Sequence, residues 1–199
     1  LGIGAFFLFS KKSFSNQNSL NELMRKQFLG SNNAPIKIKE FFSLTCGHCS
    51  NFHIKTLPQL KKKYIDTGKV QLEFIDYPLD RLAVIAATLA RSIPTKDGYV
   101  EAVSILLKKQ KQWAYSKNPL NELQSIAKLF GISSKKFNDI SQNIPLMQEI
   151  VTKMEKESKN FDINSTPTFI VNDKYKISGA LSFKDFEKEL LKSINAKKS

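Results

Sequence analysis

Residues 36–52 read IKIKEFFSLTCGHCSNF and join a strand pattern to a pair of cysteines. Residues 36–42 carry β-branched and aromatic side chains, which predict a buried strand. After Ser43 the pattern becomes helical, with Cys46 and Cys49 at the junction. Unpaired backbone N–H groups and the dipole at a helix N-terminus favour an anion and lower the pKa of a thiol placed there. The C-x-x-C therefore predicts a reactive cysteine pair.

The amino-acid composition limits the classes of protein to which the chain can belong. At 199 residues, with 41% hydrophobic and 25% charged residues, the chain is large enough to bury a core in one or two domains. The net charge of +13 comes almost entirely from scattered Lys, whereas proteins that read nucleic acids rely on clustered Arg. We therefore do not expect nucleic-acid binding. Two cysteines cannot build a disulfide scaffold, and their spacing suits redox chemistry or half of a metal site.

The N-terminal residues 1–9, LGIGAFFLF, form an apolar run that is too short to span a bilayer, which takes about 20 residues. The run and its flanks predict the end of a signal segment or a membrane anchor. The absence of a small-x-small cleavage motif after it favours an anchor. The alternative is an apolar helix that docks on the domain or on a partner subunit. Residues 10–18 are polar and predict a linker.

The first part of the chain alternates between helix and strand signals. A capping box opens a short helix predicted over residues 19–29. The helix that follows Cys46 is predicted to run to about residue 63, with a kink at Pro58. Residues 70–75 alternate between apolar and polar side chains, which predicts a second strand.

The period then changes to that of helices, which predicts a helical insertion. The helical segments are 82–91, 99–112, 120–130, 133–141 and 146–158. Strand signals return at residues 168–171 and 174–177 and predict a hairpin, closed by a helix over residues 182–194. We expect Trp113 and Tyr115 to pack in the core, with a substrate contact as the alternative.

The resulting order, βαβ, then helices, then ββα, with a C-x-x-C at the first helix, predicts an α/β protein with the thioredoxin fold and an inserted helical subdomain. Four parts are predicted. Residues 1–18 form an anchor or signal remnant with its linker, and residues 19–80 form the first part of the thioredoxin fold. Residues 81–160 form the helical insertion, and residues 161–199 form the second part of the thioredoxin fold.

Five segments carry a resemblance to a known family. In chain order they are FFSLTCGHCSNFH, LPQLKKKYIDTGKV, YPLD, INSTPTFIVN and SGALSF. Together they resemble the DsbA family of bacterial periplasmic thiol-disulfide oxidoreductases, most closely its alphaproteobacterial members, from about residue 29 to the C-terminus. The resemblance implies that Cys46 is the exposed nucleophile and Cys49 its buried partner. It also implies that the redox-active disulfide between them is the only cofactor.

The same resemblance assigns roles to the residues around the pair. Gly47 and His48 would tune the thiols and contact substrate, and a protonated imidazole would stabilise the thiolate. Their Gly-His differs from the Pro-His of the family's strongest oxidants. Thr166 and Pro167 match the family's cis-proline loop, whose backbone lies against the sulfurs and pairs with an extended substrate.

Two further residues are candidates near the pair. Glu40 lies six residues before Cys46, where related sequences carry a buried acid thought to shuttle protons. Beside two phenylalanines it would be desolvated and suited to exchange a proton with Cys49, unless the strand turns it outward. His53, four residues after Cys49, is expected to be a half-buried helix residue. With the cysteines and His48 it offers ligands for zinc or copper, which leaves a metal-binding module as an alternative.

The sequence thus predicts an oxidoreductase that introduces disulfides into exported proteins by exchange at Cys46–Cys49. The expected location is the periplasm, with anchoring to the inner membrane through residues 1–9. The expected partners are exported proteins with free thiols and a DsbB-like membrane reoxidant. A disulfide isomerase or reductase using the same site is the first alternative, and the metal-binding module is the second.

Overall fold

The computed structural model describes residues 19–195, which are built around one mixed sheet. Its strands lie in the order β1-β3-β2-β4-β5. Their bounds are β1 (Phe28–Leu29), β2 (Ile36–Phe42), β3 (Val70–Asp76), β4 (Thr168–Val171) and β5 (Tyr175–Ser178). The central strand β2 runs parallel to β3 and antiparallel to β4. The hairpin of β4 and β5 from the end of the chain therefore pairs with β2 from its start.

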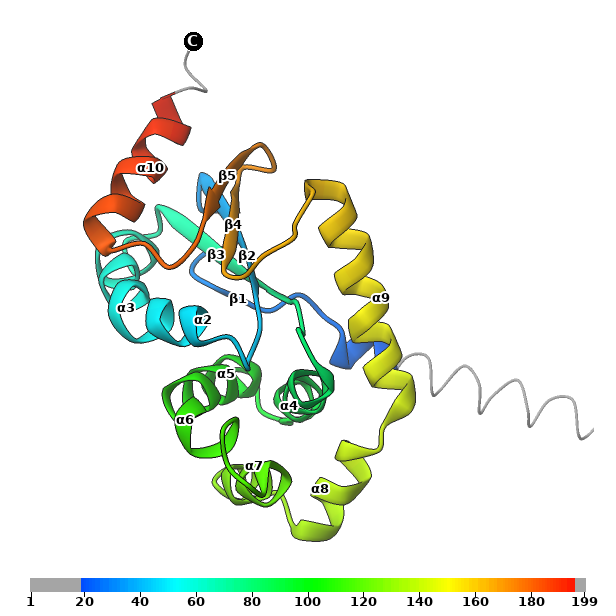
Figure 1. The fold of residues 1–199 in the computed structure, drawn as a ribbon. Helices are drawn as coiled ribbons and strands as arrows, with labels where there is room; N and C mark the ends of the chain where they lie inside the picture. The colour runs from blue at the N-terminus through cyan, green and yellow to red at the C-terminus, as the bar shows by residue number, and fades with distance from the viewer. Residues whose placement is uncertain (1–18, 196–199) are drawn as a thin grey trace, which may run out of the picture.

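A long helical stretch follows β2 and consists of α2 (Gly47–Asn51), η1 (Phe52–Thr56), α3 (Leu57–Leu60) and η2 (Lys61–Ile65), where η marks a π-helical turn. The remaining helices are α4 (Arg81–Arg91), α5 (Gly98–Lys108), α6 (Gln110–Trp113), α7 (Pro119–Lys128), α8 (Ser134–Ser141), α9 (Ile144–Phe161) and α10 (Phe183–Asn195). In Figure 1, α3 and α10 lie on one side of the sheet and α9 on the other. Helices α4 to α8 gather beyond the end of the sheet where α2 begins.

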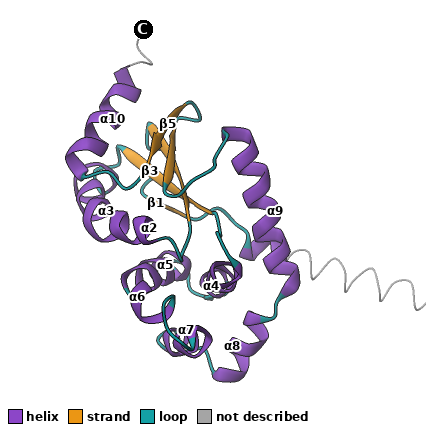
Figure 2. Ribbon diagram, viewed as in Figure 1, coloured by secondary structure: helices purple, strands orange, loops and turns teal. Residues whose placement is uncertain are grey.

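From β2 onward, the predicted order of strands and helical regions is confirmed. Strands β2 and β3 flank the cysteine-bearing helix, and β4 and β5 precede the closing helix α10. Between β3 and β4 the chain consists of helices and loops, as Figure 2 shows. The turn between β4 and β5 includes Asn172 and Asp173, which both adopt positive φ angles. Because that turn extends through residue 174, β5 begins at Tyr175, one residue later than predicted.

The helix predicted over residues 19–29 is wrong in its second half. Only residues 19–23 are helical, and Phe28–Leu29 instead form β1, antiparallel to β3. The Gln27 carbonyl also accepts a hydrogen bond from the Phe74 N–H at 2.8 Å. This short strand pairs with the otherwise open edge of β3, and edge pairing of that kind overrides a weak local helix preference.

Pro58 is accommodated by a wider helical turn. The π turn η1 comes directly before α3, in which Pro58 occupies the first turn. The Leu57 N–H reaches back to the Phe52 carbonyl. Proline has no N–H to donate, so a shifted hydrogen-bond register at this point lets the helix continue.

The aromatic residues Trp113 and Tyr115 differ in how deeply they are buried. Trp113 is fully buried, and its indole Nε1–H donates to the Leu106 carbonyl at 2.8 Å, so the prediction of core packing is confirmed. The same prediction for Tyr115 is wrong, because its side chain lies past the end of the helix and is 69% exposed. Its hydroxyl lies near Gly47 instead.

A buried polar network joins the helical insertion to the sheet. The Arg91 guanidinium in α4 donates from Nε to Asp76 Oδ2 at 2.6 Å, and the Tyr99 hydroxyl donates to Asp76 Oδ1 at 2.7 Å. Arg91 also donates to the carbonyls of Leu23 and Arg25. One guanidinium therefore ties the end of β3, two helices of the insertion and the N-terminal segment together.

Among residues 19–195, no helix is both long and apolar enough to cross a bilayer. The anchor or signal predicted at residues 1–9 and the linker predicted at residues 10–18 lie outside the described residues.

We predict that Arg91→Ala lowers the free energy of unfolding by about 3–5 kcal/mol, because it leaves the buried Asp76 carboxylate without its charged partner. Arg25→Ala is the matched control. It removes an exposed ion pair with Glu22 that is worth about 1 kcal/mol or less. Urea unfolding of both variants measures the difference, and equal losses would contradict the assigned role of the network.

Candidate active site

Cys46 is positioned by the turn that links the central strand to its helix. After β2 the chain turns through residues 43–45, and the Cys46 N–H donates to the Ser43 carbonyl at 3.1 Å. Cys46 is the N-cap of α2, with extended backbone angles (φ −80°, ψ 117°). This geometry places its sulfur at the unpaired N–H groups of the first helical turn.

The Cys46 sulfur is held in surroundings that favour its anion. The side chains around it leave the residue 9% exposed, and its pKa falls from 9.0 to about 5. The largest cause is a hydrogen bond from the Cys49 thiol, and burial opposes it. The Thr166 side chain and the backbone N–H groups of Cys49 and His48 lower the pKa further. At neutral pH Cys46 is therefore a thiolate.

The surroundings of Cys49 favour its protonated form instead of its anion. It is fully buried, and both cysteines are in the reduced form. Desolvation raises the pKa of the Cys49 thiol far above its usual value, and the negative charges of Cys46 and Glu40 raise it further. The reduced pair thus divides its roles, with a nucleophilic thiolate at Cys46 and a protonated, protected thiol at Cys49.

The loop before β4 lies against the nucleophile. The Thr166–Pro167 peptide bond is cis, and the Cys46 thiol lies 3.4 Å from the Thr166 carbonyl oxygen, to which it donates. The Thr166 hydroxyl oxygen is buried and has no hydrogen-bond partner in the structure. When Cys46 ionises, this hydroxyl can turn and donate to the sulfur. The structure therefore brings Thr166 and Pro167, 120 residues away in the chain, to the cysteine pair.

Gly47 and His48 are both exposed beside Cys46. The group of His48 that acts on the sulfur is its backbone N–H. At Gly47 an added Cβ would come no closer than 3.9 Å to Gln110 or Tyr115, so the position has room for a side chain. The predicted tuning by the His48 imidazole stays a prediction.

Glu40 points into the protein. The side chain is fully buried, and its two carboxylate oxygens lie 2.9 and 3.1 Å from Nε2 of His53. Of the two strand registers that the sequence left open, the structure has the inward one. His53 is a half-buried helix residue, as predicted. Its side chain is 5% exposed and is bound to Glu40 rather than directed at the sulfurs. Among the described residues no three His, Cys, Asp or Glu side chains gather as a metal site would need.

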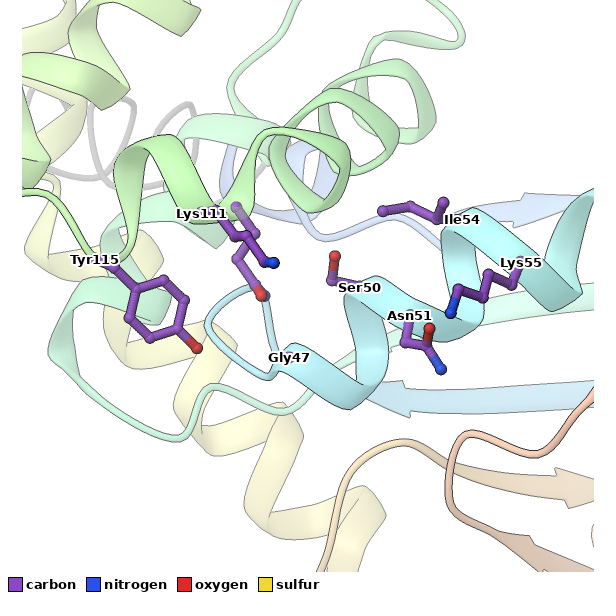
Figure 3. A pocket seen from close by; sticks show the side chains of 8 residues that line it. Gly47, Ser50, Asn51, Ile54, Lys55, Lys111 and Tyr115 are labelled. Atoms are coloured by element: carbon purple, nitrogen blue, oxygen red, sulfur yellow. The ribbon is translucent and has the colours of Figure 1, made fainter.

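A groove of about 650 Å³ runs beside the pair, between the cysteine-bearing helix and α6 (Figure 3). One wall carries Gly47, Ser50, Asn51, Ile54 and Lys55, and the other Gln110, Lys111 and Tyr115. The exposed side chain of Tyr115 stands at the Gly47 end of this groove. The substrate contact that the sequence left as the alternative for Tyr115 stays a prediction.

Sequence reasoning missed Gln110. This buried side chain donates from Nε2 to the carbonyls of Leu44 and Cys46, at 2.8 and 3.0 Å. It braces the active-site turn against the helical insertion. A lone Gln in a helical pattern carries no signal of this, because its partners are backbone atoms far away in the sequence.

Fold and site together define a thioredoxin-fold protein with a reactive C-x-x-C pair, and comparison with known proteins agrees. The family model described as Thioredoxin matches residues 23–192. The solved structure of α-DsbA1 from Wolbachia pipientis is similar, with a TM-score of 0.76 and 31% identity over 87% of this chain and 94% of that one. Accordingly, the chain belongs to the DsbA-like proteins of the thioredoxin family, which confirms the family resemblance found in the sequence.

Two curated relatives extend this result. A protein-disulfide oxidoreductase from Rickettsia typhi is 31% identical over 144 residues, which cover 72% of this chain and 53% of the relative. The matched segment is thus about half the length of that protein. A disulfide bond formation protein D from Bacillus anthracis is 28% identical over 89% of this chain and 81% of the relative.

We predict that Thr166→Val raises the pKa of Cys46 by about one unit. The hydroxyl is a donor only to the thiolate, and one hydrogen bond to a charged group is worth about 1.5 kcal/mol, or roughly one unit of pKa. The pH dependence of Cys46 alkylation by iodoacetamide measures it, with a wild-type midpoint at a pH of about 5. Ser165→Ala is the control, since that hydroxyl contacts Thr168. An unchanged midpoint in Thr166→Val would contradict the role of the hydroxyl.

Proposed function

We propose that this protein is an oxidase that transfers the Cys46–Cys49 disulfide to protein thiols. The observation that carries the proposal is the unequal pair, with the pKa of Cys46 lowered to about 5 and that of buried Cys49 raised. A stable thiolate is a good leaving group and favours the reduced enzyme, so the oxidised enzyme gives its disulfide away readily.

The reaction consists of two exchanges. A substrate thiolate attacks Cys46 Sγ of the disulfide, the Cys46–Cys49 bond breaks, and Cys49 leaves with the electron pair and takes up a proton. A second substrate thiolate then attacks the substrate sulfur of the mixed disulfide, and Cys46 leaves as its stable thiolate. The substrate dithiol is oxidised to a disulfide, and the enzyme disulfide is reduced to the pair seen in the structure.

Substrate contacts follow from the surfaces around Cys46. The backbone at Thr166 and Pro167 is the proposed edge on which an extended substrate segment pairs, since it lies directly against the sulfur. Gly47 and His48, which follow the nucleophile in the chain, are exposed and complete the proposed contact surface. The redox-active disulfide serves as the only cofactor in this proposal.

The proposed location is the periplasm, where exported proteins with free thiols are the substrates and a DsbB-like membrane protein reoxidises the pair. The family membership and the relative named disulfide bond formation protein D support this proposal. Anchoring through residues 1–9 remains a prediction from the sequence.

A disulfide isomerase or reductase that uses the same pair is the second candidate. The observation in its favour is Gly47-His48, because a glycine leaves this position without the side chain that the family's strongest oxidants carry. The metal-binding alternative has less support, since the fourth candidate ligand, His53, is bound to Glu40.

We predict that Cys46→Ser reduces the oxidation of a dithiol peptide to the uncatalysed rate. Cys49→Ala keeps the nucleophile but lacks the resolving thiol. Its Cys46 thiolate should attack the disulfide of the oxidised peptide, release the second peptide sulfur as a thiolate and accumulate as a mixed disulfide, visible by mass spectrometry. Ser125→Ala, an exposed change on α7, serves as the control and should retain full turnover. Activity retained in Cys46→Ser would sink the mechanism.

A further inference from the structure

The buried Glu40–His53 pair lies beneath the active site and has no part in the exchange steps above. Glu40 comes from the central strand β2, and His53 from the cysteine-bearing helix. The His53 ring lies 5.7–5.9 Å from the rings of Phe42, Phe52 and Phe74. Aromatic packing thus holds the imidazole in place with Nε2 at both carboxylate oxygens.

Cys49 needs a partner for its proton. The thiol must lose a proton when it attacks the mixed disulfide at Cys46, and it must regain one when the disulfide opens. Cys49 is fully buried, so it cannot exchange that proton directly with solvent. The charge of Glu40 acts on the Cys49 thiol, which makes this buried carboxylate the candidate acceptor of the Cys49 proton.

Glu40 is itself fully buried, so a proton that reaches it needs a further route. His53 provides a route, because it lines a pocket of about 240 Å³ between the cysteine-bearing helix and α5. The pocket is mainly apolar, with Lys61 and Ser104 as its other polar residues. His53 is therefore shared by the buried carboxylate and a cavity at the helix interface.

The geometry points to His53 as the proton-relay residue of the disulfide exchange, connecting Glu40 to solvent through this pocket. The inference rests on the proposed function. When Cys49 attacks Cys46 Sγ in a mixed disulfide, a new Cys46–Cys49 bond forms and the bond to the partner sulfur breaks. The electron pair leaves with the partner thiolate. The Cys49 proton goes to Glu40, then to Nε2 of His53, and a proton leaves to solvent. Reduction runs the same path in reverse.

Other ionisable groups face this path from the elements packed around it. They are Cys46 at the N-cap of α2, Tyr99 on α5, whose hydroxyl binds Asp76 and feels the charge of Glu40, and Lys61 on η2. Tyr99 is bound to Asp76 and its pKa is raised well above the usual value, which keeps it protonated. His53 is thus the residue through which a proton on Glu40 can move on.

The test measures two steps separately: the formation of a mixed disulfide at Cys46, and its resolution by Cys49, in which Cys49 must lose its proton. Reduced enzyme is mixed with oxidised glutathione, and acid-quenched samples analysed by mass spectrometry give two rates. The first is the formation of the Cys46–glutathione mixed disulfide, and the second is its resolution by Cys49. His53→Gln keeps a hydrogen-bonding group at Glu40 but cannot relay a proton. We expect it to slow resolution at pH 7 by about 100-fold, a typical contribution of general acid–base catalysis, and to leave mixed-disulfide formation unchanged within twofold.

Imidazole rescue distinguishes a relay from a structural role. His53→Ala opens the ring site into the pocket, and added imidazole should restore resolution in that variant while leaving wild type and the exposed control Ser125→Ala unaffected. If His53→Ala does not fold, the rate at which His53→Gln resolves the mixed disulfide tests the inference by itself. Resolution within twofold of wild type in folded His53→Gln would overturn the inference, as would a slow, folded His53→Ala that imidazole does not restore. A wild-type enzyme that forms no mixed disulfide would instead refute the proposed function, and with it this inference.

Discussion

The site depends on one negative charge, held on the Cys46 sulfur at the start of a helix. The helix N-terminus supplies backbone N–H groups to that charge, and the Cys49 thiol supplies a further hydrogen bond. Burial works against ionisation at both sulfurs, but at Cys46 the hydrogen bonds outweigh it, and at Cys49 they do not. Two neighbouring cysteines therefore have different roles: Cys46 is a nucleophilic thiolate, and Cys49 is a buried thiol that keeps its proton.

Three distant parts of the chain keep this charge in place. The turn after β2 supplies Cys46, the loop before β4 supplies Thr166, and α6 supplies Gln110, which binds the carbonyls of the turn. The insertion that carries Gln110 is in turn fixed to β3 through the network of Arg91 and Asp76. The helical insertion thus does more than cover the end of the sheet, because it braces the backbone that carries the nucleophile.

Much of the fold could be predicted from the sequence, because apolar periodicity and turn residues give strong local signals. The C-x-x-C, the strands around it and the helical insertion all follow from such signals. The errors come from tertiary contacts. Residues 28–29 leave a helical pattern to pair with β3, and Tyr115 lies outside the core because α6 ends at Trp113.

The site was predictable in part for the same reason. Cys46 and Cys49 are visible in a single motif, whereas Thr166 and Pro167 were recognised only through the family resemblance. The inward register of Glu40 could not be decided locally, since a shift of one residue along a strand exchanges its faces. Its partnership with His53 and the bracing by Gln110 depend on how helices pack, and no local pattern reports that.

The reduction potential of the Cys46–Cys49 pair, measured in glutathione buffers, tests the central claim most directly. A thiolate stabilised as strongly as Cys46 favours the reduced enzyme, so the account predicts a potential near about −120 mV, in the range of strong oxidants. A potential of about −180 mV or lower, as in isomerases and reductases, would contradict the oxidase account and favour the second candidate.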